Sequence, residues 1–180
     1  DNENSLSLVI NTIPRDAIVS FDTETTDIDV RNAKIVGFSF AYEENKAYYV
    51  PIAHSYLGVA AQISNEAARQ AIIQLNRHKL VLQNFKYDYE IIKNNFEIEL
   101  KLYADTMILS WLLKKKKKVG LDYQINKYFN HKMIAFKDVV KKGENFSNVD
   151  ILNACDYAAE DALMTLKLFN KQLVLFKERN

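Results

Sequence analysis

The hydrophobic periodicity of the chain changes after residue 52, and this change limits the folds that the chain can adopt. Strand-like alternation comes first, and we expect strands at 17–21, 34–41 and 47–52, joined by polar turns as an antiparallel meander. Helical periodicity then dominates, apart from a short apolar strand at 80–82. Early strands followed by helices predict an α/β fold in which helices flank a mixed central sheet.

The helical part contains four segments before the last helix begins. Ser64 is expected to cap a helix over 65–77. Further helices are expected to start near Tyr87 and at Asp105, and another covers 121–129.

The last helix has the clearest pattern. Ser147 and Asp150 match a capping box. An apolar stripe at helical spacing follows and predicts the buried face, formed by Ile151, Ala154, Ala158, Ala162, Leu166, Phe169 and Leu173.

Composition indicates one folded domain over residues 1–180. The chain is 48% hydrophobic and 26% charged, with only 4 Gly and 2 Pro, so long disordered linkers are not expected. The net charge of +1 gives no argument for nucleic-acid binding. Apolar runs are too short to span a membrane, and a single cysteine excludes an internal disulfide. Because the first residue is not Met, we expect a fragment of a longer protein.

An apolar strand runs directly into acidic residues at 22–24. In a strand, Asp22 and Glu24 point to the same face, and two adjacent carboxylates repel each other. A divalent cation with oxygen ligands would remove that conflict. The alternative is a strand end with two solvated acids.

Two later segments carry further acids. Asp88 lies near the start of a helix, where it could equally serve as a partner for the helix dipole. Tyr157 and Asp161 are four residues apart and share one helical face, either at a site or as a simple surface pair.

In this order, the acids resemble those of the DEDD exonuclease superfamily, and Tyr157 resembles the DEDDy branch of these DnaQ-like, RNase H-like enzymes. More closely, the chain resembles the 3′–5′ proofreading exonuclease domain of bacterial family A DNA polymerases, the DNA polymerase I family. The similarity runs from Val19 to Phe169. The segments that carry it are FDTETTDID, KIVGFSFAYE, AYYVPIAHSYL, LQNFKYDYEII, ADTMILSWLL, GLDYQINKYF, MIAFKDVVKKG and YAAEDALMTLKL.

The resemblance implies an RNase H-like fold and a hydrolase that holds two divalent ions, Mg²⁺ or Mn²⁺. Asp22 would contact both ions, Glu24 and Asp161 the ion beside the attacking water, and Asp88 the second ion. Tyr157 would orient the water. The reaction would hydrolyse the terminal phosphodiester of single-stranded or frayed DNA and release nucleoside 5′-monophosphates during replication and repair.

The resemblance also implies contacts with the last nucleotides. For Phe136 the alternative is core packing. Lys114 to Lys118 could contact the DNA backbone, although a solvated helix end is the favoured interpretation, and this lysine run departs from the family pattern. The positions that match substrate contacts are Thr23, Ile28, Gln83, Asn84, Tyr87 and Phe136.

The remaining candidates for chemistry are few. We expect His54, His78 and His131 in loops or at the surface, because they show no metal-ligand spacing, and Cys155 as a packed thiol.

Two other functions stay open. One is an RNA 3′-end exonuclease of the same superfamily, which would have to accept a 2′-hydroxyl. The other is a catalytically inactive module that supports a polymerase.

The expected partners are a single-stranded DNA 3′ end and a polymerase domain in the same parent chain, with no membrane. The expected location is the bacterial cytoplasm, associated with the nucleoid.

Overall fold

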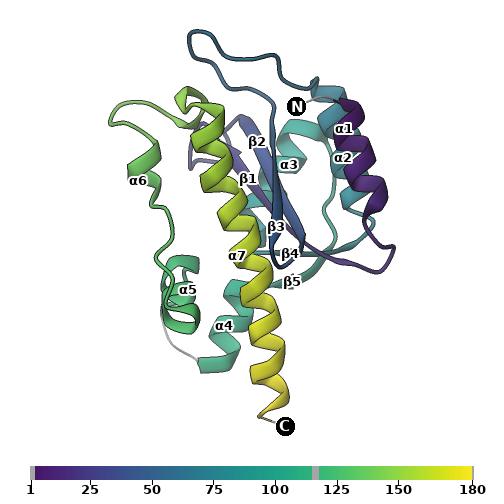
Figure 1. Cartoon of the computed structure of the whole chain (residues 1–180), viewed down its shortest axis with the longest axis vertical. Coiled ribbons are helices and arrows are strands. Elements are labelled where there is room, and N and C mark those ends of the chain that lie inside the picture. Colours follow the sequence, from purple (N-terminus) through teal and green to yellow (C-terminus); the bar gives the residue numbers. More distant parts are fainter. Residues whose placement is uncertain (1–2, 115–117, 180) are drawn as a thin grey trace.

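The computed structural model describes residues 3–114 and 118–179, and within them one five-stranded sheet forms the centre of the molecule (Figure 1). The strand order is β3-β2-β1-β4-β5. The first three strands pair antiparallel, whereas β4 and β5 continue the sheet in parallel. The expected mixed sheet is therefore confirmed. The strands are β1 (Ile18–Thr25), β2 (Ile35–Glu43), β3 (Lys46–Pro51), β4 (Lys79–Leu82) and β5 (Leu102–Asp105).

Helices cover both faces of the sheet (Figure 1). Along the described chain they are α1 (Glu3–Thr12), α2 (Asn65–Leu75), α3 (Phe85–Phe96), α4 (Thr106–Lys114), α5 (Leu121–Phe129), α6 (Phe136–Val139), a short 3₁₀ turn (Phe146–Asn148) and α7 (Ile151–Lys177).

The larger core lies between the sheet and the helices α1, α2 and α3. Phe21, Phe38 and Phe40 are fully buried there and stack in series, with ring centroids 5.7 and 6.4 Å apart. Ile72 of α2 and Ile91 of α3 pack against them. Phe38 and Phe40 are alternate residues of β2, and Phe21 pairs with Phe40 across the strands, so the three rings share one face of the sheet.

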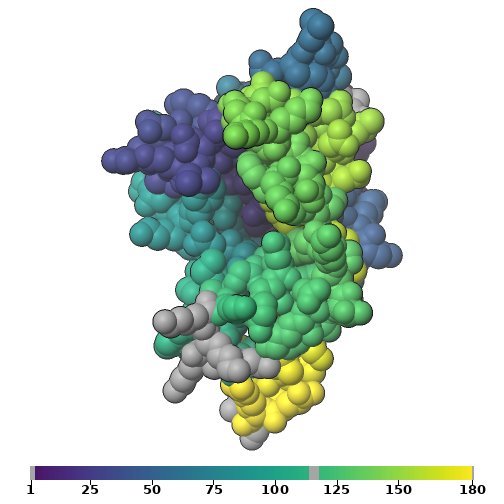
Figure 2. All heavy atoms as spheres, turned by 90° about the vertical axis from the view of Figure 1, so that its left-hand side faces the viewer, coloured from purple at the N-terminus to yellow at the C-terminus, as the bar shows by residue number. Residues whose placement is uncertain are grey.

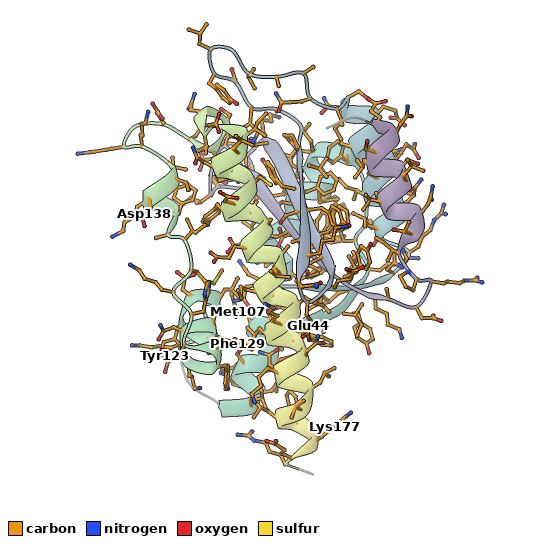
Figure 3. All side chains as sticks on the ribbon, in the orientation of Figure 1. Glu44, Met107, Tyr123, Phe129, Asp138 and Lys177 are labelled. Atoms are coloured by element: carbon orange, nitrogen blue, oxygen red, sulfur yellow. The ribbon has the colours of Figure 1, made fainter. Side chains whose placement is uncertain are left out.

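Helix α7 covers the opposite face. Its alanines at 154, 158 and 162 are fully buried, and such small side chains let the helix backbone approach the sheet. The hydroxyl of Ser20 donates a hydrogen bond of 2.7 Å to the carbonyl of Ala162, which ties α7 directly to β1. The side-chain amide of Asn170, in α7, donates to Glu44, in the turn between β2 and β3, at 2.6 Å. Figure 3 shows Glu44 beside α7.

The second half of α7 holds α4 and α5. The buried Gln172 amide donates to the Thr106 carbonyl at 2.9 Å and to the Ser110 hydroxyl at 2.8 Å. Ile125 and Met133 pack with Leu168 in a separate small core. Within the described residues, no helix combines the length and apolar character that a membrane crossing requires.

Three details differ from the sequence-based expectations. The capping box joins Asn145 and Asn148 around the 3₁₀ turn, and α7 is capped by Asp150 alone, whose side chain accepts from Leu152 N. The proposed Ser147–Asp150 box is therefore wrong. Leu173 ends the expected stripe but is 39% exposed, because the helix extends beyond the sheet there. Helices α1 and α6 and strand β5 were not expected.

Candidate metal centre

Strand β1 extends past its expected end at residue 21 and carries both Asp22 and Glu24. Asp22 and Glu24 lie on the same face as Ser20, which is the face under α7. Across the strand pair, Asp22 is opposite Ser39 and Glu24 is opposite Gly37. The regular pleat therefore directs both carboxylates towards α7.

Helix α7 supplies the third acid. One carboxylate oxygen from each of Asp22, Glu24 and Asp161 lies within 4.8 Å of the others, which is close enough to share a metal ion. The surface is hollowed where the purple segment that follows β1 faces the green segment that carries α5 and α6 (Figure 2).

Burial and mutual repulsion raise the pKa of all three carboxyls well above the ordinary range. Burial is the main cause in each case. The charge of Asp88 adds to the rise at Asp22, and the charge of Asp22 adds to the rise at Glu24 and Asp161. A bound cation would stabilise the ionised forms of these three crowded carboxyls.

Glu24 provides a direct test of whether a cation fits. The side chain is 6% exposed, and its Oε1 atom has no hydrogen-bond partner among the described residues. The nearby Ser39 hydroxyl also lacks one there. A buried carboxylate oxygen without a donor is costly unless something else satisfies it. An all-oxygen set of this kind suits a hard divalent cation.

Asp88 lies near Asp22, but its carboxylate accepts hydrogen bonds from Thr23. Its Oδ1 accepts the Thr23 hydroxyl at 2.7 Å and the Thr23 N–H at 3.1 Å, and the residue is not part of the group of three. Burial raises the pKa of Asp88 to about 7, although the two bonds from Thr23 oppose the rise. The structure thus places Asp88 close enough to influence Asp22 electrostatically.

Tyr157 stands beside Asp161 in an aromatic setting. Its ring centroid lies 5.8 Å from that of Phe146 and 6.3 Å from that of Phe136. Burial, then the charges of Asp161 and Glu24, raise the Tyr157 pKa, so the hydroxyl keeps its proton. A hydrogen bond from this hydroxyl to Asp161 opposes the rise in the Asp161 pKa.

Asp105, which the sequence placed at a helix start, ends β5 and organises the turn that leads to Asp88. Its carboxylate accepts from the backbone N–H groups of Asn84 and Phe85 at 3.2 and 2.9 Å and from Met107 at 2.8 Å. Asn84 has a φ of 68°, in the left-handed region. Asp105 therefore fixes the start of α3, a role without a short sequence signal because its partners lie about 20 positions away.

The expected substrate contacts divide into free and engaged side chains. Ile28 is 91% exposed and Phe136 is 52% exposed, so both are available to a ligand. The Gln83 amide donates to Val119 O at 3.0 Å and accepts from Thr106 at 2.5 Å. The Tyr87 hydroxyl donates to Asp27 O at 2.7 Å.

The segment before α6 is anchored next to the acids. Glu160 accepts from Ile134 N at 2.7 Å and contacts His131 Nε2 at 2.7 Å. Because Glu160 precedes Asp161 in α7, the same helix turn supplies a carboxylate to the site and holds the loop that leads to Phe136.

The expectation that the histidines lie in loops or at the surface is confirmed for His54, which lies in a loop. His54 follows β3 in a loop but is only 4% exposed, and it contacts Tyr49 and Val149. His78 and His131 are partly exposed, and Cys155 is half-buried. The sequence offered no local sign of the His54 contacts.

The lysine run lies largely outside the described residues, since these omit 115–117. Lys118 Nζ lies 5.4 Å from the ring centroid of Tyr123 on α5. Tyr123 points away from α7 (Figure 3).

Comparisons with known proteins agree with the geometry. A family described as 3′–5′ exonuclease matches residues 1–174. The chain is 36% identical over 168 residues to DNA polymerase I of Borreliella burgdorferi, which covers 90% of this chain and 18% of that protein. It is 41% identical over 160 residues to DNA polymerase I of Pseudomonas aeruginosa, with coverage of 84% and 18%. The chain thus spans less than a fifth of the length of these relatives.

The fold has solved counterparts. Escherichia coli RNase D, an exoribonuclease, is 15% identical with a TM-score of 0.72, covering 98% of this chain and 44% of that one. At this identity the likeness shows a shared RNase H-like fold and nothing about the substrate.

Proposed function

The chain belongs to the 3′–5′ exonuclease family, and we propose that its four acids, Asp22, Glu24, Asp88 and Asp161, hold two divalent metal ions while it shortens a DNA strand from the 3′ end. The substrate is single-stranded or frayed DNA and the products are nucleoside 5′-monophosphates. The biological role is proofreading during DNA replication and repair.

One observation carries the proposal. Carboxylate oxygens of Asp22, Glu24 and Asp161 converge within 4.8 Å, although burial and repulsion disfavour their ionised forms. Acids that served only as solvent-exposed surface groups would not need to lie so close together. Two metal ions, Mg²⁺ or Mn²⁺, are the counter-charge that this arrangement favours.

The residues divide the work by position. Asp22, which interacts electrostatically with the other three acids, would contact both ions. Glu24 and Asp161 would serve one ion, and Asp88 would serve the other through water. When bound, such ions lower the pKa of an attacking water and neutralise charge on the leaving 3′ oxygen. The Tyr157 hydroxyl, protonated and adjacent to Asp161, would orient the water by a hydrogen bond.

Substrate contacts are proposed at the edge of this centre. The exposed Phe136 ring would stack on a base in any sequence, and Ile28 would wedge against a neighbouring one. Thr23, Gln83, Asn84 and Tyr87 would line the terminal nucleotide, with Thr23 also holding Asp88.

DNA is favoured over RNA because the relatives at 36 and 41% identity are DNA polymerases I. The RNA alternative rests on fold likeness alone. A DNA strand and an RNA strand of equal sequence, compared in one assay, separate the two. Faster shortening of the RNA would contradict the proposal.

The parent protein is proposed to contain a polymerase domain in the same chain, because the matched relatives are more than five times longer than the matching region. A cytoplasmic, nucleoid-associated location is part of the same proposal. Synthesis and strand transfer would belong to sequence outside these 180 residues.

The decisive assay measures the shortening of a 5′-labelled single strand with Mg²⁺. Asp161→Ala should lower the rate on the order of 10²-fold or more. Asp156→Ala is the matched control, since Asp156 lies on the same helix with an exposed side chain. Equal rates for Asp161→Ala and the unmodified chain would overturn the assignment, and so would inactivity of the unmodified chain with both Mg²⁺ and Mn²⁺.

A further inference from the structure

A tyrosine from β3 lies against the metal centre without belonging to it. A Cβ atom placed on Gly37 would lie 2.3 Å from the Tyr49 hydroxyl oxygen and 2.6 Å from the adjoining ring carbon, so the phenol occupies the space above Gly37. Gly37 is the cross-strand partner of Glu24. Side chains at paired positions approach to roughly 5 Å. The Tyr49 hydroxyl is therefore beside the Glu24 carboxylate.

The charge of Glu24 acts on this hydroxyl. After burial, it is the largest influence that raises the Tyr49 pKa, which agrees with a hydroxyl close to Glu24. A tyrosine hydroxyl carries one hydrogen that it can donate. A protonated phenol beside a buried carboxylate would ordinarily donate to it. Here Glu24 Oε1 has no donor in the part of the chain that the structure describes.

The hydrogen of Tyr49 has another acceptor. The Tyr49 hydroxyl lies 2.6 Å from His54 Nε2, and His54 Nδ1 lies 2.9 Å from the Val149 carbonyl. A carbonyl oxygen only accepts, so Nδ1 carries the hydrogen. Burial lowers the pKa of His54 and keeps the ring neutral, which leaves Nε2 as the acceptor for Tyr49.

We propose that His54 is a positioning residue for the metal centre: it accepts the hydroxyl hydrogen of Tyr49, prevents that hydrogen from bonding Glu24, and so leaves the Glu24 carboxylate open to a cation. This inference rests on the metal role of Glu24 in the proposed function. The neighbouring groups agree with it, since Tyr49 packs with the core that contains Val149 and Phe146 and its orientation is thereby restricted.

Binding of Mn²⁺ to the whole 180-residue chain, followed by electron paramagnetic resonance of the free ion, tests the inference without reference to catalysis. In His54→Asn the amide can still donate to Val149 O, but no acceptor remains near Tyr49. The released hydroxyl then competes for Glu24, and Mn²⁺ affinity should fall roughly tenfold. In His54→Gln an amide oxygen can reach the Nε2 position, and affinity should stay close to that of the unmodified chain.

The double variant separates positioning from folding. Tyr49→Phe removes the competing hydrogen, so it should leave Mn²⁺ affinity unchanged alone and should restore it when combined with His54→Asn. A purely structural role of His54 would give no such rescue.

Two results would overturn the inference. One is a double variant that binds Mn²⁺ as weakly as His54→Asn, and the other is weakened binding in Tyr49→Phe alone, which would mean that the hydroxyl supports Glu24. Failure of the proposed function looks different, because the unmodified chain would then bind no Mn²⁺ and Glu24→Gln would change nothing.

Discussion

Thr23 donates two hydrogen bonds to a single oxygen of Asp88, from its hydroxyl at 2.7 Å and from its backbone N–H at 3.1 Å. Thr23 lies between Asp22 and Glu24 on β1, with its side chain on the opposite face of the strand. One strand therefore carries two of the four acids, Asp22 and Glu24, and orients another, Asp88, which comes from α3.

The Thr23 hydroxyl should stabilise the ionised form of Asp88. In Thr23→Val the pKa of Asp88, already raised to about 7, should rise further, because a donor that lowers it is lost. At a pH above 7 the free energy of unfolding should fall by about 1–3 kcal/mol. Carbon-13 NMR of the Asp88 carboxyl and urea denaturation in EDTA measure the two effects. Thr23→Ser keeps the hydroxyl and is the control, and an unchanged Asp88 pKa in Thr23→Val would contradict this role.

The metal-free protein should become less stable as pH rises. A carboxyl with a raised folded pKa holds its proton more tightly when folded, so its contribution is complete below the unfolded pKa of about 4 and is lost as pH rises through the folded pKa. That upper limit is about 7 for Asp88, and the pKa values of Asp22, Glu24 and Asp161 are also raised.

The measurement is urea denaturation in EDTA between about pH 5 and pH 8. Asp88→Asn removes one titrating group and retains an acceptor for Thr23, so its free energy of unfolding should decline less steeply with pH. Mn²⁺ should restore stability, and more so at the higher pH. Parallel pH profiles of the two proteins would show that burial of Asp88 has no such consequence.

Removing the Tyr157 hydroxyl should impair chemistry and spare metal binding. Tyr157→Phe keeps the ring that contacts Phe136 and Phe146. We expect nucleotide release to slow by roughly 10²-fold, because the attacking water loses its orienting partner. Mn²⁺ affinity and melting temperature should change little. If Mn²⁺ affinity fell along with the rate, Tyr157 would act through its hydrogen bond to Asp161 and would not orient water.

Phe136 should contribute to DNA binding more than to folding. The ring is 52% exposed, so Phe136→Ala removes little buried contact. Affinity for labelled single-stranded DNA, measured by fluorescence anisotropy in an Asp22→Ala background, should fall by about 1–3 kcal/mol. Phe129→Ala on α5 is the control, since that ring is 39% exposed. Equal DNA affinities of Phe136→Ala and Phe129→Ala would indicate that Phe136 only packs against its neighbours and does not bind DNA.

The central strands and the last helix were predictable from sequence because their patterns reflect burial directly. Phe38 and Phe40 alternate with smaller residues, and Ala154, Ala158 and Ala162 mark the face of α7 on the sheet. Strand β5 escaped prediction because it is four residues long with an exposed first half. Helix α1 escaped because it buries only Ile10 fully.

The site was predictable to the extent that it depends on local geometry. The period of a strand brings Asp22 and Glu24 together, and a carboxylate oxygen of Asp161 lies within 4.8 Å of theirs. The orientation of Asp88 towards Thr23 could not be read from spacing, because it depends on how α3 docks beside β1. The burial of His54 likewise depends on Val149, which is 95 positions away.

The most direct test is anomalous diffraction from crystals of this chain soaked in Mn²⁺ with a short DNA strand. We expect one peak at the shared position of the Asp22, Glu24 and Asp161 oxygens and a second on the Asp88 side of Asp22, with the 3′ end of the DNA beside them. Mn²⁺ peaks only elsewhere on the molecule, with those three carboxylates hydrogen-bonded to protein or water, would contradict the metal site on which the proposed function depends.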